Sequence, residues 1–263
     1  MLILLPPSEG KTAALRTASM NLAELSFPEL SEARSLVLRE LAEVSLHPQA
    51  LQKLGVGASL ATEVARNIKL AHEPAAAAHS VYSGVLFDAL GYRSMTPTQR
   101  RKADESVVVI SGLWGAVRFA DRIPAYRLSM SVSLPGVGRL ASFWKPLLSR
   151  ALAELAEDQL VIDCRSSTYS TAWTPPSAQT VEINVFQERA GERKVVSHFA
   201  KHTRGELARH LLTRQGKAAQ TPQELLVIAQ EKWQAGMVPG TSKKPHGLSL
   251  ILPEGISFAA AKN

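Results

Sequence analysis

The chain has 263 residues, of which 45% are hydrophobic, so it can bury a large core without disulfide bonds or a structural metal. Its single cysteine, Cys164, excludes an intramolecular disulfide framework, and no apolar run reaches the length of a membrane span or a signal peptide. The formal net charge of +7 arises within residues 189–244, which is typical of a solvated basic face or of a surface for a polyanion. We therefore expect a cytoplasmic protein with no membrane partner.

The first strand and the residues after it form a first candidate site. Residues 1–5 are an apolar run ended by two prolines, which predicts a buried strand. Ser8 and Lys11 follow within the sequence Ser-Glu-Gly-Lys-Thr. The Gly-Lys-Thr suggests a P-loop, but that motif requires a glycine where Leu5 stands, so this is not a Walker A loop. Ser8 and Lys11 remain candidates to hold an anion at the end of the strand.

Residues 29–46 have apolar side chains at helical spacing and predict a helix, and a helical hairpin element follows at about 45–72. Gly55 and Gly57 enclose Val56, which is the pattern of a helix-hairpin-helix turn. Without side chains there, the amides of the turn can face a phosphate. The basic residues placed to neutralise flanking phosphates are Lys53, Arg66 and Lys69. This predicts sequence-tolerant binding to double-stranded DNA; the alternative is an ordinary helical hairpin whose glycines only close the turn.

Residues 74–90 predict a helix with a Tyr-Ser-Gly turn, and the β-branched run 107–110 predicts a buried strand. Ser111 and Gly112 begin a glycine-containing turn after that strand, and Arg118 and Arg127 follow further along the chain. Glycines that expose amides, followed by guanidinium groups, are typical of an anion site for phosphate. The alternative is a surface loop with solvated arginines.

The rest of the chain predicts further strands and helices. Strands are expected at 127–133, 160–164, 180–186, 194–199 and 248–252, helices at 143–156, 205–214 and 222–234, and a loop at 163–177. Because several neighbouring strands have no helix between them, we expect an α+β fold, with a mixed β-sheet core and flanking helices, in a single domain over residues 1–263.

Two segments of this second half carry candidate ligand-binding residues. Ser166 and Tyr169 follow the strand at 160–164. Lys201 and Arg204 stand just before the helix expected at 205–214, a second place suited to an anion. If the strands share one sheet, these residues and those after the strands at 1–5 and 107–110 converge on one crevice. The alternative is that each caps or solvates its own loop.

An ordered set of motifs over residues 1 to about 214 resembles the YaaA family of peroxide stress proteins. Residues 111–118 resemble the family's Ser-Gly-Leu-aromatic-Gly-x-x-Arg run, and 126–130 its aromatic-Arg-Leu-x-Met. Residues 8–12 resemble its Ser-Pro-Ala-Lys-Thr, and 198–205 its Phe-Tyr-Ala-Lys-Lys-Ala-Arg-Gly. At 166–169 relatives have Ser-Asp-Glu-Tyr; this chain keeps the serine and the tyrosine but lacks the two carboxylates.

The resemblance implies the family's "cantaloupe" fold, a helix-hairpin-helix element, a positively charged cleft, and a role in protecting DNA and limiting intracellular iron damage under peroxide stress. The alternative is an enzyme acting on a nucleotide or another phosphorylated small molecule in a pocket lined by Lys and Arg. No Ser-His-Asp or Cys-His arrangement and no metal-ligand spacing is visible, so the sequence predicts no named reaction, no metal and no cofactor.

Overall fold

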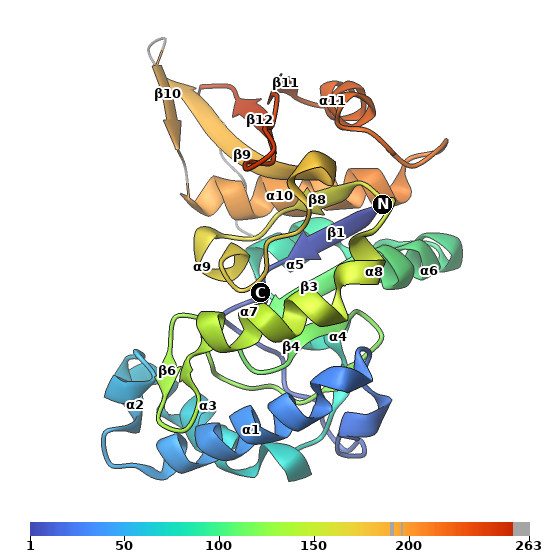
Figure 1. Cartoon of the computed structure of the whole chain (residues 1–263). Coiled ribbons are helices and arrows are strands. Elements are labelled where there is room, and N and C mark those ends of the chain that lie inside the picture. The colour runs from blue at the N-terminus through green and yellow to red at the C-terminus, as the bar shows by residue number, and fades with distance from the viewer. Residues whose placement is uncertain (190–191, 196, 255–263) are drawn as a thin grey trace.

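The computed structural model describes residues 1–189, 192–195 and 197–254, and a mixed β-sheet runs through its centre (Figure 1). The described strands of this sheet have the order β11-β12-β9-β8-β1-β3-β4, and β10 pairs with β9 off this path. They are β1 (Leu2–Leu5), β3 (Val107–Ser111), β4 (Gly115–Arg118), β8 (Val161–Asp163), β9 (Thr180–Arg189), β10 (Glu192–Val195), β11 (Gln234–Val238) and β12 (His246–Leu252). The pairings among β3, β1, β8, β9 and β12 are parallel, whereas β4, β10 and β11 are antiparallel to their neighbours.

The centre of the sheet is apolar on both faces, as expected for parallel strands covered by helices. Every residue of β1 and β3 is buried. Because β1, β3 and β8 are parallel, the segments that follow them leave the sheet at one edge. That edge is where open α/β sheets place their ligands.

Helices flank the sheet, and α10 packs against both β9 and α5 while α7 contacts β4. The α-helices are α1 (Ser31–Leu46), α2 (Ala50–Lys53), α3 (Ala61–Arg66), α4 (Ala78–Val81), α5 (Val85–Leu90), α6 (Pro97–Ser106), α7 (Leu140–Ala151), α8 (Ala153–Ala156), α9 (Ser167–Ser170), α10 (Ser197–Thr213) and α11 (Pro222–Gln230). Short 3₁₀ turns lie at 22–24, 28–30, 58–60, 67–72, 92–94 and 177–179. Two small strand pairs lie outside the main sheet: β2 (Ala76–Ala77) with β5 (Arg122–Ile123), and β6 (Ser133–Leu134) with β7 (Gly138–Arg139).

The α+β class, with a mixed sheet and flanking helices, is therefore confirmed. The strands expected at 1–5, 107–110, 160–164, 180–186 and 248–252 and the helix at 29–46 all form within a few residues of their expected bounds. The helix expected at 143–156 forms as α7 and α8, and the one expected at 222–234 ends at Gln230 because β11 begins four residues later. The loop expected at 163–177 contains one helical turn, α9.

The strand expected at 127–133 is wrong. The segment is irregular until β6, and at its first residue, Arg127, a side chain from another part of the chain takes both backbone hydrogen bonds. Asn67 Oδ1 accepts from the Arg127 amide at 2.9 Å, and Asn67 Nδ2 donates to the Arg127 carbonyl at 2.8 Å. The side-chain amide of Asn67 thus takes the place of a neighbouring strand.

The strand expected at 194–199 and the helix expected at 205–214 are also corrected. β10 ends at Val195, residue 196 lies outside the described residues, and α10 is helical from Ser197. Gly205 lies inside this helix, where a Cβ would collide with the carbonyl oxygen of Leu86 and the Cβ of Ala89 in α5. Glycine has a low helix propensity, so the sequence suggests a helix boundary at Gly205. The close packing of α10 on α5 instead places this glycine inside the helix.

The helix α6 was not predicted, although its start has a clear local signal. Thr96 and Gln99 form a reciprocal capping box, and Pro97 occupies the first helical position. Only Ala103 of this helix is buried, so there is no apolar stripe by which periodicity could identify it.

Candidate functional site

The carboxyl ends of β1 and β3 bring together Ser8, Lys11 and Ser111, with Arg127 beside them. The segment after β1 turns back so that Lys11 forms an isolated antiparallel bridge with Tyr82. Lys11 Nζ donates to the Ser8 carbonyl at 2.8 Å and to the Glu9 carbonyl at 3.3 Å. Arg127 Nη1 donates to the same Glu9 carbonyl at 2.9 Å, so the amine and the guanidinium are close neighbours.

Lys11 also lies over an aromatic ring, with Nζ 4.2 Å from the centroid of Tyr126. Burial, assisted by the neighbouring Arg127, lowers the pKa of Lys11 to about 7, against the opposing effects of Glu9 and Glu63. The two carbonyls and the ring face can receive the three N–H groups of the ammonium form. Near neutral pH this amine can therefore either hold an anion or accept a proton.

We predict that Lys11 makes stability depend on pH between about 7 and 10.5. In this range the unfolded chain keeps the lysine proton and the folded chain has released it, so the free energy of unfolding rises as pH rises. Lys11→Met removes this contribution. Urea unfolding of wild type and variant at several pH values should therefore give a difference between them that grows with pH. Lys217→Met, at an exposed lysine, is the control, and a difference for Lys11→Met that is constant across the range would contradict the prediction.

A chain of buried hydroxyl groups lies beneath Lys11. Ser111 Oγ accepts from the amides of Leu113 and Trp114, at 3.2 and 3.1 Å, so its own proton is left for Tyr126 Oη at 2.6 Å. Tyr126 Oη lies 3.1 Å from Tyr82 Oη. Burial raises the pKa of both tyrosines, which keeps them protonated at neutral pH. Ser111 thus fixes the turn after β3 and orients the Tyr126 ring, over which Lys11 Nζ lies.

Gly112 has a packing role in the same turn. A Cβ there would lie 3.1 Å from the Met130 amide nitrogen and 3.2 Å from the Ser129 carbonyl carbon. Its carbonyl accepts from Trp144 Nε1 at 2.9 Å. The glycine therefore lets the segment after Arg127 pass close to the end of β3.

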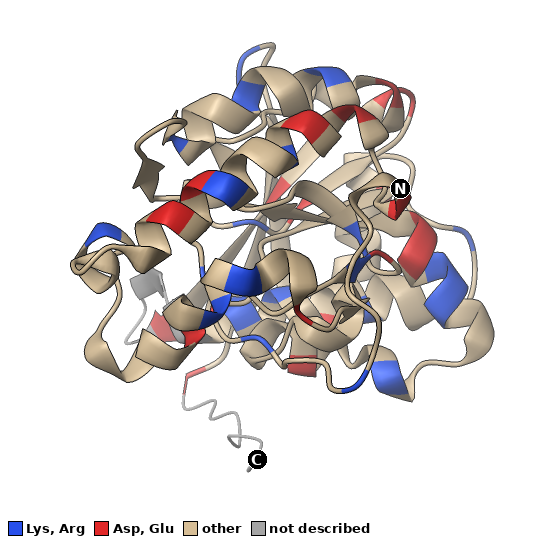
Figure 2. Ribbon diagram, turned by 90° about the horizontal axis from the view of Figure 1, so that it is seen from below, with Lys and Arg blue, Asp and Glu red and all other residues tan. Residues whose placement is uncertain are grey.

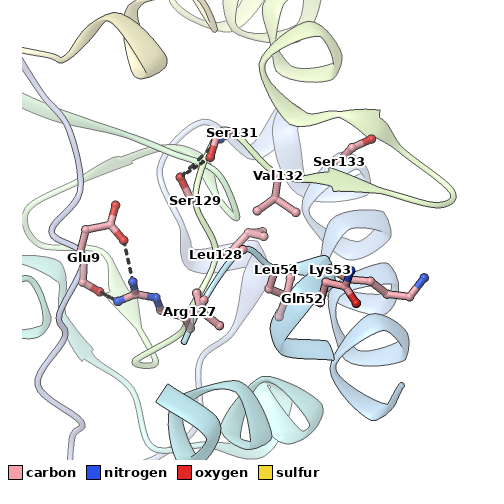
Figure 3. Close-up of a pocket in the computed structure, with 12 residues that line it drawn as sticks. Glu9, Gln52, Lys53, Leu54, Arg127, Leu128, Ser129, Ser131, Val132 and Ser133 are labelled. Carbon is pink, nitrogen blue, oxygen red and sulfur yellow. Dashed lines mark hydrogen bonds and ion pairs between the residues drawn. The ribbon is translucent and has the colours of Figure 1, made fainter. Parts of the chain in front are cut away.

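Arg127 is the centre of an ion-pair cluster on the wall of a cavity of about 450 Å³ (Figure 3). Its Nη2 lies 3.1 Å from Glu9 Oε2, and its Nη1 lies 3.8 Å from Glu63 Oε2. The Arg127 side chain is 15% exposed, whereas that of Glu9 is 53% exposed. Glu9 is thus the partner that an incoming anion can displace most easily.

The opposite wall of this cavity is the turn of the helical hairpin, from Gln52 to Val56. Gly55 has φ of +65°, which an L side chain rarely adopts, while Gly57 has an ordinary extended backbone. A Cβ at either glycine would meet no atom within 4 Å, so the backbone is open to an approaching group. The amides of Gly55 and Val56 donate within the turn, to Gln52 and Leu51.

The next three amides of the hairpin, at residues 57–59, have no recorded hydrogen-bond acceptor in the described part of the chain. Of the basic hairpin residues, Lys53 and Lys69 are exposed, and the Lys53 side chain points away from Arg127 (Figure 3). Arg66 Nε lies 4.0 Å from Glu73 Oε2. The helices on both sides of the turn are short, because α2 has four residues and α3 has six.

Tyr169 reaches the same edge of the sheet from α9. It is buried, and Ser129 and Met130 lie beside its hydroxyl. Burial, with Glu9 nearby, raises its pKa to about 12. Ser166 directly precedes α9, and its carbonyl accepts from the Tyr169 amide at 2.9 Å.

Three predicted site residues do not join this group. Arg118 lies at the far end of β4, opposite Val108, and donates to the Glu105 carbonyl at 2.7 Å. Arg204 donates twice to the Ile183 carbonyl of β9, at 3.1 and 2.8 Å. Lys201 is exposed within α10. The interpretation that Lys201 and Arg204 precede a helix start is wrong, because α10 begins at Ser197.

The basic segment 189–244 also lies away from the hairpin. It forms β10, α10, α11 and β11, at one end of the molecule, whereas α2 and α3 lie at the other (Figure 1). Figure 2 shows Lys and Arg spread over many elements and interspersed with Asp and Glu. The excess positive charge is thus not concentrated around the cavity.

Sequence reasoning missed Tyr82, Tyr126 and Asn67 as parts of this site. The two tyrosines lie in motifs that the sequence marks, but their hydroxyl chain depends on a bridge between distant segments. Asn67 has no local signal, since its partner lies 60 positions later.

Within the part of the chain that the structure describes, no group of three or more His, Cys, Asp or Glu side chains is arranged to hold a metal ion. Over the same residues, no helix combines the length and the apolar character needed to cross a bilayer. Cys164 is buried, and burial raises the pKa of its thiol to about 12, which makes it unreactive.

The family model and the similar proteins agree on one family for this chain. The family model described as "Peroxide stress protein YaaA" matches residues 1–236. A UPF0246 protein of Streptomyces coelicolor is 46% identical over 261 residues, which cover 97% of this chain and 99% of that protein. A UPF0246 protein of Corynebacterium efficiens is 41% identical over 88% of this chain and 92% of its own length. One from Cereibacter sphaeroides is 33% identical over 68% of this chain and 70% of its own length.

Proposed function

Because the chain belongs to the YaaA family of peroxide stress proteins, we propose that it binds double-stranded DNA during peroxide stress and so protects DNA and limits intracellular iron damage. The contact proposed is between the DNA backbone and the hairpin turn of residues 55–59, together with Arg127 on the facing wall of the same cavity. Contact with phosphates alone carries no sequence information, so binding should tolerate any sequence.

The observation that supports this proposal is the pairing of an open glycine turn with Arg127 across one cavity. The three amides at 57–59 are suitable donors to a phosphate oxygen. A phosphate entering the cavity would compete with Glu9 for the Arg127 guanidinium. Lys53 and Lys69 would contribute through the longer-range attraction of exposed cations.

Gly57→Val tests the turn without straining it, because the Gly57 backbone is one that valine adopts. We expect the branched side chain to keep the backbone away from a phosphate and to weaken duplex binding by about tenfold or more, which is about 1.4 kcal/mol. Gly236→Val in β11 is the matched control, since its Cβ would also meet no atom within 4 Å. Fluorescence anisotropy with two duplexes of unrelated sequence measures both.

A second variant tests the cavity through an expected increase in duplex affinity instead of a decrease. Glu9→Gln removes the carboxylate that competes for Arg127 and should tighten duplex binding, a gain that misfolding cannot produce. The wild-type affinity should fall steeply between about 50 and 200 mM salt. Affinity that is insensitive to salt, or Gly57→Val and Gly236→Val proteins that bind equally well, would exclude this mode of binding.

A second candidate function is an enzyme acting on a small phosphorylated molecule, and the observation that favours it is the shared Glu9 carbonyl. Lys11 and Arg127 meet there, next to buried tyrosine hydroxyls. A basic amine beside a guanidinium is suited to holding a phosphate and moving a proton. Inorganic pyrophosphate should then raise the melting temperature of wild type but not of Lys11→Met. That result, with duplex affinity unchanged in Gly57→Val, would favour the enzyme.

A further inference from the structure

The cavity between the hairpin turn and the segment that begins at Arg127 is small compared with a DNA duplex. Its volume of about 450 Å³ lies within the range of about 300–1,000 Å³ that is usual for sites of small ligands, so it can hold a group of about the size of one nucleotide. A double helix cannot enter it, since the major groove alone is about 12 Å wide. The interior of the cavity is therefore open only to a group that projects from the DNA.

The Arg127 side chain is less accessible than the residues around it. It is 15% exposed, whereas the Glu9 side chain is 53% exposed and Lys53, Ser131 and Ser133 are also exposed. A phosphate within a strand is joined to a sugar on both sides, so it stays on the outside of the duplex. A phosphate at the end of a strand is joined to a sugar on one side only. Such a phosphate can turn into the cavity and reach the guanidinium.

The charges of the cavity favour a ligand with two negative charges. Of the described residues that line it, Lys53 and Arg127 are cationic and Glu9 is anionic. The lining thus has one excess positive charge, and two once a ligand displaces Glu9. Glu63 lies outside the lining, 3.8 Å from Arg127 Nη1, and the ammonium form of Lys11 offsets it. A phosphate monoester carries about −1.5 to −2 charge at neutral pH, which is more than a phosphate within a strand carries.

Serine hydroxyls that follow Arg127 in the chain can bind the further oxygens of such a phosphate. Ser129 Oγ and Ser131 Oγ lie 3.0 Å apart (Figure 3). When Ser129 donates to Ser131, the hydroxyl proton of the exposed Ser131 is free for a ligand. Ser133 adds another exposed hydroxyl to the lining. A phosphate monoester has three strong acceptor oxygens, one for each kind of contact and one to spare, and a phosphate within a strand has fewer.

We propose that this cavity binds the phosphate monoester at the end of a DNA strand, so that the protein prefers broken strands to intact ones; this rests on the DNA binding proposed above. The hairpin turn contacts the intact backbone, and Arg127 and Ser131 hold the strand end. Two kinds of strand end present the same chemistry, because the phosphate can be attached at the 5′ or at the 3′ position of the terminal sugar.

DNA dumbbells, which are duplexes closed by a loop at both ends, test this because they have no strand end. A one-nucleotide gap is introduced with a 5′-phosphate, with a 3′-phosphate or with hydroxyls on both sides, and fluorescence anisotropy measures each affinity. We expect a gap with a phosphate to bind about tenfold more tightly than the hydroxyl gap, which is about 1.4 kcal/mol. The position of the phosphate that gives the gain identifies the strand end. Equal affinity for gaps with and without a phosphate would overturn the proposal.

Two variants place the strand end in this cavity. Ser131→Glu adds a carboxylate at an exposed position of the lining and should remove the preference for a phosphate, while Ser149→Glu, at an exposed serine of α7, is the matched control. Glu9→Gln should increase the preference, since a carboxylate repels two negative charges more than one. A preference that neither Ser131→Glu nor Glu9→Gln changes would mean that the phosphate binds elsewhere, and would overturn the proposal.

The affinity for the closed dumbbell and the preference for a phosphate are separate results. Gly57→Val should weaken the binding of every dumbbell by the same factor and leave the preference as in wild type. A loss of affinity in Gly57→Val without any phosphate preference in wild type would overturn only the strand-end site. A preference that persists while Gly57→Val binds as wild type does would overturn only the hairpin contact. Failure of every dumbbell to bind would overturn both.

Discussion

Replacing Arg165 with Met is expected to lower the free energy of unfolding by about 3–5 kcal/mol, the cost usually found when one partner of a buried ion pair is removed. Asp163 Oδ1 accepts from Arg165 Nε at 2.8 Å, and Asp163 Oδ2 lies 2.6 Å from Arg165 Nη2. Both side chains are buried, at 0% exposed for Arg165 and 5% for Asp163. The variant leaves the Asp163 carboxylate without its partner in a region of low dielectric constant.

The same guanidinium also shapes the loop that carries Tyr169. It donates to the carbonyls of Tyr169 and Trp173, at 3.3 and 2.9 Å, so the loop is folded around one side chain. Urea unfolding measures the loss, with Arg150→Met as an exposed control expected to change stability by less than about 0.5 kcal/mol. The double variant Asp163→Asn with Arg165→Met should recover part of the loss, since no unpaired charge remains. A single-variant loss below about 1 kcal/mol would show that the pair contributes little.

Arg34→Met is expected to cost a similar amount, about 3–5 kcal/mol, for a different reason. Arg34 is fully buried in α1 and binds carbonyl groups rather than a carboxylate. Its Nε donates to Trp114 at 3.0 Å, and its Nη2 donates to Ser26 at 2.7 Å and Ala116 at 2.8 Å. Burial lowers the pKa of Arg34 to about 10, so it remains charged at neutral pH. Methionine fills the volume but removes the guanidinium donors from these three carbonyls; the Ser26 carbonyl is part-buried, and the Trp114 carbonyl keeps the bond from the Ala116 amide.

Arg39→Met is the control for this prediction because Arg39 lies on the same helix and is exposed. Arg34→Lys keeps the charge but loses the planar fork of donors, so it should also be destabilised. Stability is measured by urea unfolding, and a change at the turn of residues 112–116 by the near-ultraviolet circular dichroism of the four tryptophans, one of which is Trp114. An Arg34→Lys protein as stable as wild type would mean that charge, and not the geometry of the donors, holds this turn.

The sequence is a good guide to the sheet because its central strands are short runs of large apolar side chains between strong breakers. β1 stops at Pro6 and β3 at Gly112, so local chemistry defines both. The segment 127–133 has the composition of a strand as well, yet it is irregular, and Asn67 takes the backbone hydrogen bonds of Arg127 that a neighbouring strand would make. No pattern within that segment records a partner 60 residues away.

The candidate site likewise contains residues whose position the sequence predicts and residues whose position it does not. Lys11 and Tyr169 lie at one edge because each follows a parallel strand, which element order alone predicts. Arg118 does not, because Gly115 turns the chain back and β4 runs antiparallel to the amino end of β3. Arg204 is displaced because packing on α5 begins α10 eight residues before the expected start. The net positive charge of the chain did not indicate where the site lies, because the excess of Lys and Arg is at the end of the molecule opposite the hairpin.

The two hydrogen bonds between Asn67 and Arg127 have a mechanical consequence. The hairpin cannot swing away from the sheet edge without breaking both, and a side-chain amide that replaces a strand tolerates little sliding. These bonds therefore hold the hairpin turn and Arg127 at a fixed separation across the cavity. A ligand between them is selected by whether it fits that width, since the cavity does not close around it.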